Sequence, residues 1–530
     1  MKTVRVLPLL FSILSGAFGI SNVQGQTPAL DKLSSYVEKA MRDWEVPGVA
    51  ISIVNEDAVI LAKGYGVTEL GKPGRVDENT IFSIASVTKA FTSASVGMLV
   101  DAGKVEWDEP VVKYLPGFAL YDPRVTAEFT VRDLLSHHSG LERGDWLWSG
   151  TGYDRDGVVA HLRYLRPIAG LRAAYGYSNN MYIAAGQMVA AVSKMTWDDF
   201  VKSRIFVPLG MTRSGTTVRV LPGMDNVAIP HEPIAGVLKP VSHGNLDNEA
   251  PGGAITSTVS DMARWIRFQL GDGTFEGKRI MSAASLEETH TPQTIMPVSS
   301  SDPVSEPGKH FSAYCFGWQA LDYRGCKLLT HTGAYDGIRS EIALVPEHHF
   351  GFMILTNRGR GNTLTTPIRN YILDLMLDAS GRDWSADFLK QARIAEERAA
   401  ADAKRLEAAR VTGTSPSLPL EAYVGTYSED GFGVAQITLK AGKLYARLGP
   451  RNEGELEHWH YNTFRANWQD PLRAHSLITF SLNSAGKVDA IDVQGLRVYR
   501  RTIATMPQAA AVLLAGRSRA KATAPHGPNF

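Results

Sequence analysis

The chain has 530 residues, 44% hydrophobic and 21% charged, which is enough to bury a large core and to form more than one domain. The formal net charge is +1, which argues against a broad basic surface for nucleic acid and against ligand steering by overall charge. The sequence contains no Cys-x-x-Cys, no His-Glu-x-x-His and no other spacing typical of a metal site, so we expect neither a metal nor a cofactor.

The N-terminal segment, residues 1–25, has the pattern of a secretory signal. Lys2 and Arg5 precede an apolar run from about Val6 to Ile20, and small and polar residues follow it. The run is short for a membrane span and is interrupted by serines and glycines. We therefore expect cleavage after Gly25, no stable membrane insertion, and a mature protein in the periplasm or outside the cell.

Residues 26–386 are expected to form one domain of mixed helices and strands. The apolar spacing after residue 29 predicts a helix, and "PGVAISIV" and "AVILAKGYGV" predict two strands around the turn "NED". A helix is predicted from Ser86 to about Ala102, and further helices at "VRDLLSH", "NMYIAAGQMVAAVSK" and "VSDMARWIRFQL". Successive strands are predicted from Phe311 to Thr356, beginning with "AYCFGWQAL". Strands at both ends with helices between them predict an α+β layered fold.

The composition changes after about Asp387. Residues 387–412 are rich in alanine, arginine and glutamate and predict an exposed linking helix. Residues 413–502 contain short alternating runs with turns between them, which predict a small all-β sandwich or barrel. The tail, residues 503–530, is predicted to be disordered.

Cys315 and Cys326 are the only cysteines in the sequence. An oxidising compartment would permit a disulfide between them. The turn between the flanking strands is expected at Asp322 to Gly325, however, and that register does not place the two cysteines opposite each other. We therefore expect no bridge.

The motif Ser-x-x-Lys places a lysine one helical turn from a serine, and it occurs three times. The copies at Ser484 and Ser518 fall in an expected hairpin turn and in the basic tail, where no dry, rigid site is expected. Ser86 instead starts a predicted helix within an apolar run, so the Lys89 amine can point at its hydroxyl. Burial would lower the lysine pKa, and the helix N-terminus would favour an oxyanion. Alone, such a motif more often marks a helix that begins at a serine and carries a charge.

Two further motifs follow in the chain, "YSN" at Tyr177 to Asn179 and "HTG" at His331 to Gly333. The ordered set of three is far more specific than any one of them. A competing "HSG" at His138 lies before the tyrosine motif and so has the wrong order; we interpret His137 and His138 as a helix end and loop.

The three motifs, together with "PGGAITSTVSDMARW", "GWQAL" and "GAYDGIRSEIALVP", resemble those of the penicillin-recognising serine hydrolases. This family includes class C β-lactamases, penicillin-binding DD-peptidases, D-aminopeptidases and family VIII carboxylesterases. The resemblance covers about Leu30 to Ala379. It implies a β-lactamase/transpeptidase-like fold, in which helices flank an antiparallel sheet and a helical insertion carries part of the site.

The resemblance also implies roles for the motif residues. Ser86 attacks a carbonyl and becomes acylated, while Lys89 and Tyr177 share the proton transfers, with either one as the base. Asn179 donates to the substrate amide and holds the lysine; its structural alternative is a helix cap. His331 stands where many relatives have lysine, and it can hydrogen-bond Tyr177 or a substrate carboxylate.

The third motif and its neighbours supply the oxyanion and substrate contacts. The backbone N–H groups of Ser86 and Ala334 are expected to form the oxyanion hole, with Thr332 and Gly333 beside them. Because His331 is not a permanent cation, recognition of a carboxylate, as in penicillins, is expected to be weak. Three aromatic residues are further candidates for the pocket wall, although they can equally serve as loop anchors: Trp146, Trp148 and Tyr335.

The C-terminal β region, with "LEAYVGTY", resembles the lipocalin-like appendage of some of these hydrolases. Such an appendage caps the active site or mediates assembly, including a homo-oligomer, and an inert stability module is the alternative. The expected reaction is acyl transfer from an amide or ester to water. Short linear peptides, including those with D- or other non-standard residues, are the first choice of substrate, ahead of small esters and β-lactams. A sensor that is acylated without turnover is the non-enzymatic alternative.

Overall fold

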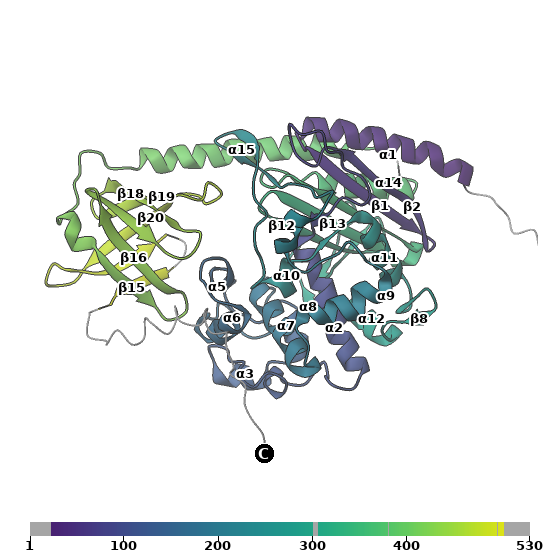
Figure 1. The fold of residues 1–530 in the computed structure, drawn as a ribbon, viewed down its shortest axis with the longest axis horizontal. Helices are drawn as coiled ribbons and strands as arrows, with labels where there is room; N and C mark the ends of the chain where they lie inside the picture. The colour runs from purple at the N-terminus through teal and green to yellow at the C-terminus, as the bar shows by residue number, and fades with distance from the viewer. Residues whose placement is uncertain (1–22, 300–305, 380, 495–496, 503–530) are drawn as a thin grey trace, which may run out of the picture.

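The computed structural model describes residues 23–299, 306–379, 381–494 and 497–502 (Figure 1). The predicted signal segment lies outside these ranges except for its last three residues, which begin helix α1 (Val23–Asp43). The predicted disordered tail also lies outside them. Within the described ranges, no helix combines the length and the apolar character that a bilayer span requires.

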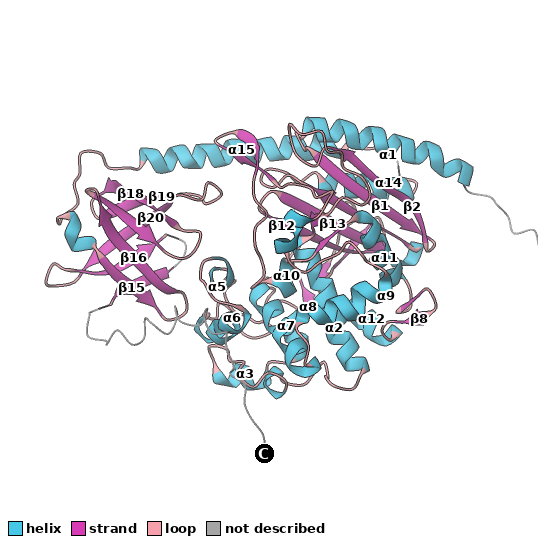
Figure 2. Cartoon of the chain, viewed as in Figure 1, coloured by secondary structure: helices cyan, strands magenta, loops and turns pink. Residues whose placement is uncertain are grey.

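An antiparallel sheet of eight strands, in the order β2-β1-β14-β13-β12-β11-β10-β9, forms the centre of the N-terminal domain (Figure 2). The early strands lie beside the last ones because β1 pairs with β14, with Val49 opposite Thr356. The predicted hairpin of β1 and β2 is confirmed. The strands are β1 (Gly48–Asn55), β2 (Ala58–Gly66), β9 (Thr294–Ile295), β10 (Ser312–Tyr314), β11 (Gln319–Tyr323), β12 (Cys326–Tyr335), β13 (Ile338–Val345) and β14 (Phe350–Thr356).

Both faces of this sheet are buried under helices. Alternate residues of β1 point to opposite faces, so Ala50 and Val54 join one apolar cluster while Ile51 and Ile53 join the other. Helix α11 (Val259–Leu270) packs on the first face, and α1 and α14 (Thr365–Met376) pack on the second (Figure 1). The predicted α+β layered fold is confirmed.

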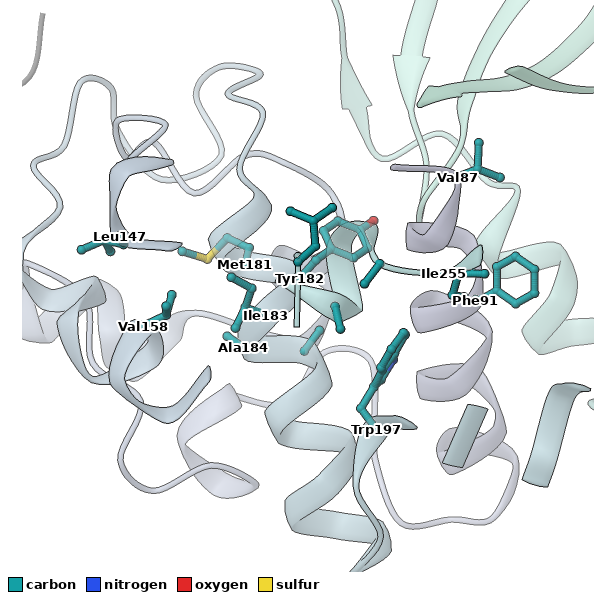
Figure 3. Close-up of a cluster of buried hydrophobic side chains, with 14 of the residues drawn as sticks. Val87, Phe91, Leu147, Val158, Met181, Tyr182, Ile183, Ala184, Trp197 and Ile255 are labelled. Carbon is teal, nitrogen blue, oxygen red and sulfur yellow. The ribbon is translucent and has the colours of Figure 1, made fainter. Parts of the chain in front are cut away.

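A helical region extends from the first face and holds α2 (Thr88–Asp101) against α7 (Asn179–Ser193). Figure 3 shows Phe91, Tyr182 and Trp197 in the cluster that fills this region, and all three side chains are buried. Because α2 follows the Ser86 turn directly, this packing fixes the turn relative to α7. The remaining helices of the domain are α3 (Pro123–Glu128), α4 (Val131–Leu135), α5 (Trp146–Ser149), α6 (Arg155–His161), α8 (Trp197–Val201), α9 (Val207–Leu209), α10 (Ala250–Gly253) and α12 (Ala283–Thr289).

The segment "AYCFGWQAL", predicted as one strand, is instead two strands joined by a tight turn. Gly317 adopts φ +79°, and the Cys315 N–H donates to the Trp318 carbonyl oxygen at 2.7 Å. Glycine accepts this left-handed conformation without a Cβ clash, so the chain reverses there. The turn between β11 and β12 lies within the predicted residues Asp322 to Gly325, and Tyr323 pairs with Cys326 across it. Both cysteines are free, so no disulfide joins them.

The linking helix α15 (Trp384–Ala408) begins before residue 387, where the composition changes. Its first residue is the reason: the Trp384 ring is fully buried, and its indole N–H donates to the Asp374 carboxylate at 2.9 Å. Asp374, on α14, also accepts from the Tyr323 hydroxyl and from Arg324, both at 2.8 Å. One carboxylate therefore joins the sheet, α14 and the start of the linking helix.

The C-terminal region is a closed antiparallel barrel of eight strands in sequential order, which decides between the predicted sandwich and barrel. The barrel closes where Tyr427 of β15 pairs with Arg501 of β22. Inward-facing residues such as Phe464, Phe480 and Ile491 are buried and fill the interior. The strands are β15 (Gly425–Glu429), β16 (Gly433–Lys440), β17 (Lys443–Arg447), β18 (Glu453–His460), β19 (Thr463–Trp468), β20 (Ser476–Leu482), β21 (Val488–Val493) and β22 (Arg497–Arg501).

Replacing Asp374 with alanine is expected to destabilise the N-terminal domain by about 3 kcal/mol, because the change leaves buried donors and Arg324 without their acceptor. Urea unfolding followed by tryptophan fluorescence measures the loss. Asp402→Ala, on the exposed part of α15, is the matched control and should change stability by less than about 0.5 kcal/mol. Equal stability of the two variants would contradict the role given to Asp374.

Candidate active site

Ser86 lies in a 3₁₀ turn, Ala85–Val87, which leads directly into α2. The residue before it, Ala85, adopts φ +45°, a left-handed conformation that costs a non-glycine residue about 1 kcal/mol. Packing holds this strained turn: the Ala85 methyl and the Ile84 carbonyl oxygen lie 3.2 Å and 2.2 Å from where a Cβ on Gly333 would stand. Glycine at 333 is therefore what lets the "HTG" strand approach the serine.

The Lys89 side chain is fully buried, and its amine nitrogen lies 3.2 Å from the Ser86 hydroxyl oxygen. The same nitrogen donates to the Asn179 side-chain oxygen and to the Gly252 carbonyl oxygen, each at 2.7 Å. A neutral amine has two N–H groups and one lone pair. Because two acceptors take the N–H groups, the lone pair is left facing Ser86, as a base requires.

Burial lowers the pKa of Lys89 to about 8, while the nearby Glu249 and Asp145 carboxyl groups act in the opposite direction. A substantial fraction of the amine is therefore neutral near pH 8. Lys89 also lies beneath the ring of Tyr177, with 5.0 Å between its nitrogen and the ring centroid.

The Tyr177 hydroxyl donates to the Ser86 oxygen at 2.9 Å. Burial raises the pKa of this phenol well above its usual range, which keeps the proton on the oxygen. With the phenol protonated and part of the amine able to accept, the resting geometry is compatible with Lys89 as the base and with Tyr177 as a hydrogen-bond donor to the nucleophile.

His331 is buried on β12, and its hydrogen bond differs from the predicted one. Its Nε2 lies 3.0 Å from the Tyr314 hydroxyl, whereas the rings of His331 and Tyr177 have centroids 6.5 Å apart. Its Nδ1 lies 2.7 Å from the Thr332 carbonyl oxygen, which only accepts, so Nδ1 carries the proton and Nε2 accepts from Tyr314. Burial and the charge of Lys89 lower the His331 pKa to about 3, so the ring is neutral at ordinary pH.

The segments expected to form the oxyanion hole are packed together. The Ser340 hydroxyl, opposite Gly333 in the sheet, donates to the Ile84 carbonyl oxygen at 2.7 Å and ties the strand to the serine turn. Ala334 and Thr332 are exposed on β12, so a bound substrate can reach them. This arrangement brings the Ser86 turn and the Ala334 backbone to the same side of the site.

Sequence patterns missed several residues around these motifs. Asp145 accepts the Asn179 side-chain N–H at 3.1 Å and the Trp148 indole N–H at 3.0 Å, and Arg143 pairs with it. His137, which the sequence places at a helix end, is buried, and the centroid of its ring lies 4.3 Å from that of the Tyr177 ring. No short motif links these positions to the serine, so only the fold reveals their proximity.

A cavity of 1350 Å³ lies between the N-terminal domain and the barrel. Ser86, Lys89, Tyr177 and His331 do not line it; it adjoins their surroundings through Tyr335, which follows Ala334, and through Trp148, which donates to Asp145. Trp148 and Tyr335, two of the three predicted wall residues, line it, with ring centroids 6.3 Å apart. Trp146 does not: its side chain is buried in the core, where Gly150 packs against its ring. The short helix α5 turns the two tryptophans to different sides, and the predicted wall role of Trp146 is wrong.

The barrel contributes directly to the cavity wall. Arg451, in the loop between β17 and β18, pairs with Asp336 at 2.7 Å and donates to the Tyr335 hydroxyl at 3.1 Å. Gly449, in the same loop, leaves no room for a side chain, because a Cβ there would lie 1.7 Å from the Gly150 carbonyl oxygen. The barrel thus contacts both the end of β12 and the α5 loop.

A serine flanked by a buried lysine and a protonated tyrosine, beside the inner strands β12 and β13 of an antiparallel sheet covered by helices, defines the class of the β-lactamase-like serine hydrolases. The chain belongs to the family described as "Beta-lactamase", which matches residues 33–376. Residues 409–506, which include the barrel, match a "Domain of unknown function (DUF3471)".

Relatives with curated names include the "Unguisins hydrolase ungD" of Aspergillus violaceofuscus, which is 31% identical over 461 residues and covers 79% of each chain. "Penicillin-binding protein 4" of Amycolatopsis lactamdurans is 29% identical over 342 residues, 62% of this chain and 86% of that protein. The first relative is named a hydrolase and the second a penicillin-binding protein.

Solved structures share the fold over most of the chain. The octameric penicillin-binding protein homologue from Pyrococcus abyssi aligns with a TM-score of 0.60 at 21% identity, covering 89% of this chain and all of that one. SurE with D-Leu aligns with a TM-score of 0.52 at 19% identity, covering 90% of this chain and all of SurE.

Acylation of Ser86 is expected to become faster as the pH rises and to level off above about 8, because only the neutral Lys89 amine accepts the serine proton. Lys89→Ala should remove this dependence and slow acylation at least about a hundredfold. Tyr177→Phe should keep the dependence while slowing the step. A fluorophosphonate probe followed from pH 5 to 10 measures the rate, with the exposed Lys104→Ala as control. A rise near pH 8 that survives in Lys89→Ala would contradict the assignment.

Proposed function

We propose that the protein is a secreted or periplasmic serine hydrolase that cleaves short linear peptides through an acyl-Ser86 intermediate, with D- or other non-standard residues among its substrates. The observation that carries the proposal is the position of the Lys89 nitrogen, which Asn179 and Gly252 hold 3.2 Å from the Ser86 oxygen, where its neutral form can accept the serine proton.

The reaction begins when the Ser86 oxygen bonds to the substrate carbonyl carbon and its proton passes to the Lys89 nitrogen. The carbonyl electron pair moves to the oxygen, which the backbone N–H groups of Ser86 and Ala334 are expected to stabilise. When this intermediate collapses, the leaving amine departs with the proton, relayed from Lys89 through Tyr177, and the acyl group stays on the serine. Water then attacks the ester, and the same groups transfer the proton in reverse.

The size of the cavity supports a peptide substrate. Sites for drug-sized ligands occupy roughly 300–1,000 Å³, and the cavity here has 1350 Å³. Its wall offers the aromatic faces of Trp148 and Tyr335 together with polar groups of both domains. Because Ser86 itself does not line the cavity, a substrate must extend from the serine to reach it; a peptide of several residues can do so, whereas a small ester would leave the cavity to water.

The names of relatives give independent support. One relative at 31% identity is named a hydrolase of unguisins, and SurE, which shares the fold, was solved with D-Leu. The D-Leu in the structure of this neighbour is the basis for including D-residues in the proposed substrate class.

The neutral His331 is the reason for placing β-lactams last. Penicillins carry a carboxylate, which a permanent cation at this position would bind, and the low pKa of His331 leaves no charge there. A carboxylesterase remains the second candidate, because the same nucleophile and base act on esters.

A substrate panel tests the proposal: p-nitrophenyl butyrate, nitrocefin, D-Ala p-nitroanilide and linear peptides with L- or D-residues at the scissile bond. We expect steady turnover, with the highest kcat/KM on peptides, and a loss of at least about a thousandfold in Ser86→Ala. Ser518→Ala, in the Ser-x-x-Lys copy of the C-terminal tail, is the matched control. One stoichiometric burst without further turnover would indicate a sensor, and a preference for the ester over every peptide would favour the carboxylesterase.

A further inference from the structure

Glu249 is a buried carboxyl group beside the catalytic lysine that the mechanism above does not use. Its side chain is 3% exposed, and the residue immediately precedes α10. Its backbone carbonyl accepts the N–H groups of Gly252 and Gly253, but its carboxyl group does not cap the helix. The Glu249 side chain therefore does not serve as the N-terminal cap of α10, which is the usual role of an acidic residue just before a helix.

The two glycines of "APGG" make the space for this carboxyl group. A Cβ on Gly252 would lie 2.1 Å from Oε1 of Glu249, and a Cβ on Gly253 would lie 2.4 Å from Oε2. The same point above Gly252 lies 3.5 Å from the Lys89 nitrogen. Oε1 of Glu249 and the Lys89 nitrogen therefore lie on either side of the space above Gly252. The distance between these two atoms is no greater than the sum of 2.1 Å and 3.5 Å.

Within the described part of the chain, no side chain or backbone group donates a hydrogen bond to the carboxyl oxygens or forms a close ion pair with them. Burying a carboxylate without such partners is costly, and burial raises the pKa of Glu249 to about 8, so the group becomes negatively charged in the same pH range in which the Lys89 amine becomes neutral. The charged and titratable groups that face it are Lys89 on α2, Arg143 and Asp145 before α5, and the phenols of Tyr177 and Tyr335. Of these, only Lys89 and Arg143 are cationic, and Arg143 already pairs with Asp145.

We propose that Glu249 is a positioning residue for the proton transfer: its negative charge stabilises the ammonium that Lys89 becomes when it accepts the proton of Ser86. The step is balanced, since the Oγ–H bond of Ser86 breaks, an N–H bond forms on Lys89, and the serine oxygen bonds to the acyl carbon. Starting from the neutral amine, this step creates a positive charge on Lys89. An ionised Glu249 carboxylate nearby lowers the free energy of that state more than that of the neutral one.

The inference rests on the proposed function and has a consequence for pH. Removing the negative charge makes the ammonium less stable, so the pKa of Lys89 falls and the rise in acylation rate moves to lower pH. A less basic amine is also a weaker base, so the plateau falls. A group that only filled space would lower the plateau and leave the position of the rise unchanged.

The test compares Glu249→Gln with the full-length wild-type protein in fluorophosphonate acylation from pH 5 to 10. We expect the rise to move down by about one pH unit and the plateau to fall about tenfold. Glu249→Asp, which keeps the charge, should restore the wild-type position of the rise. Gly253→Ala, whose new methyl displaces the carboxyl group, should shift it as the glutamine does.

Glu397→Gln is the matched control, since it removes one negative charge from an exposed position on α15 that does not line the cavity. Its profile should overlay that of the wild type. Coincident profiles for wild type and Glu249→Gln, or a lower plateau with an unmoved rise in both Glu249→Gln and Gly253→Ala, would overturn the inference alone. Labelling of the wild type that persists in Ser86→Ala would instead overturn the proposed function, and the inference with it.

Discussion

The hydrogen bonding of the buried Lys89 amine to two acceptors is the interaction on which the site depends. An amine exposed to water is protonated at neutral pH and presents no lone pair. Here the fold encloses it completely and offers two oxygen acceptors, Asn179 and Gly252, and one hydroxyl. Desolvation lowers the pKa of the amine to about 8, so that a fraction of it is neutral near that pH, and the two acceptors orient this neutral form. The chemistry therefore follows from how these segments meet.

Those segments are held by different parts of the fold. The serine turn is locked between α2 and β12, where Gly333 allows close approach. Asn179 is the first residue of α7, which packs on α2, and Gly252 belongs to α10, which packs on both helices. The large sheet fixes β12, and the buried cluster around Phe91 and Tyr182 fixes the helices. The catalytic geometry is therefore a property of the whole N-terminal domain rather than of one loop.

The features that depend on residues close together in the sequence could be predicted from it. Ser86 and Lys89 share a helical turn, and the hairpins and amphipathic helices follow from local periodicity, so both could be predicted. The surroundings of the lysine could not. Its contact with Gly252 joins positions 163 residues apart, and α10 is a four-residue helix of Ala, Pro and Gly that resembles a loop in sequence. The turn at Gly317 was missed because an apolar run hides a single glycine.

The barrel is joined to the N-terminal domain by the linking helix that starts at Trp384, and its loops contact that domain, among them the loop that carries Gly449 and Arg451 and the loop in which Leu472 accepts from Arg360. A covalent tether turns docking into an intramolecular event, with an effective concentration that reaches the millimolar range for short linkers. A few polar contacts that would not hold two separate proteins together can then keep the barrel loop at the cavity wall. The selectivity of that wall can therefore change through single substitutions in the loop, while the hydrolytic core stays as it is.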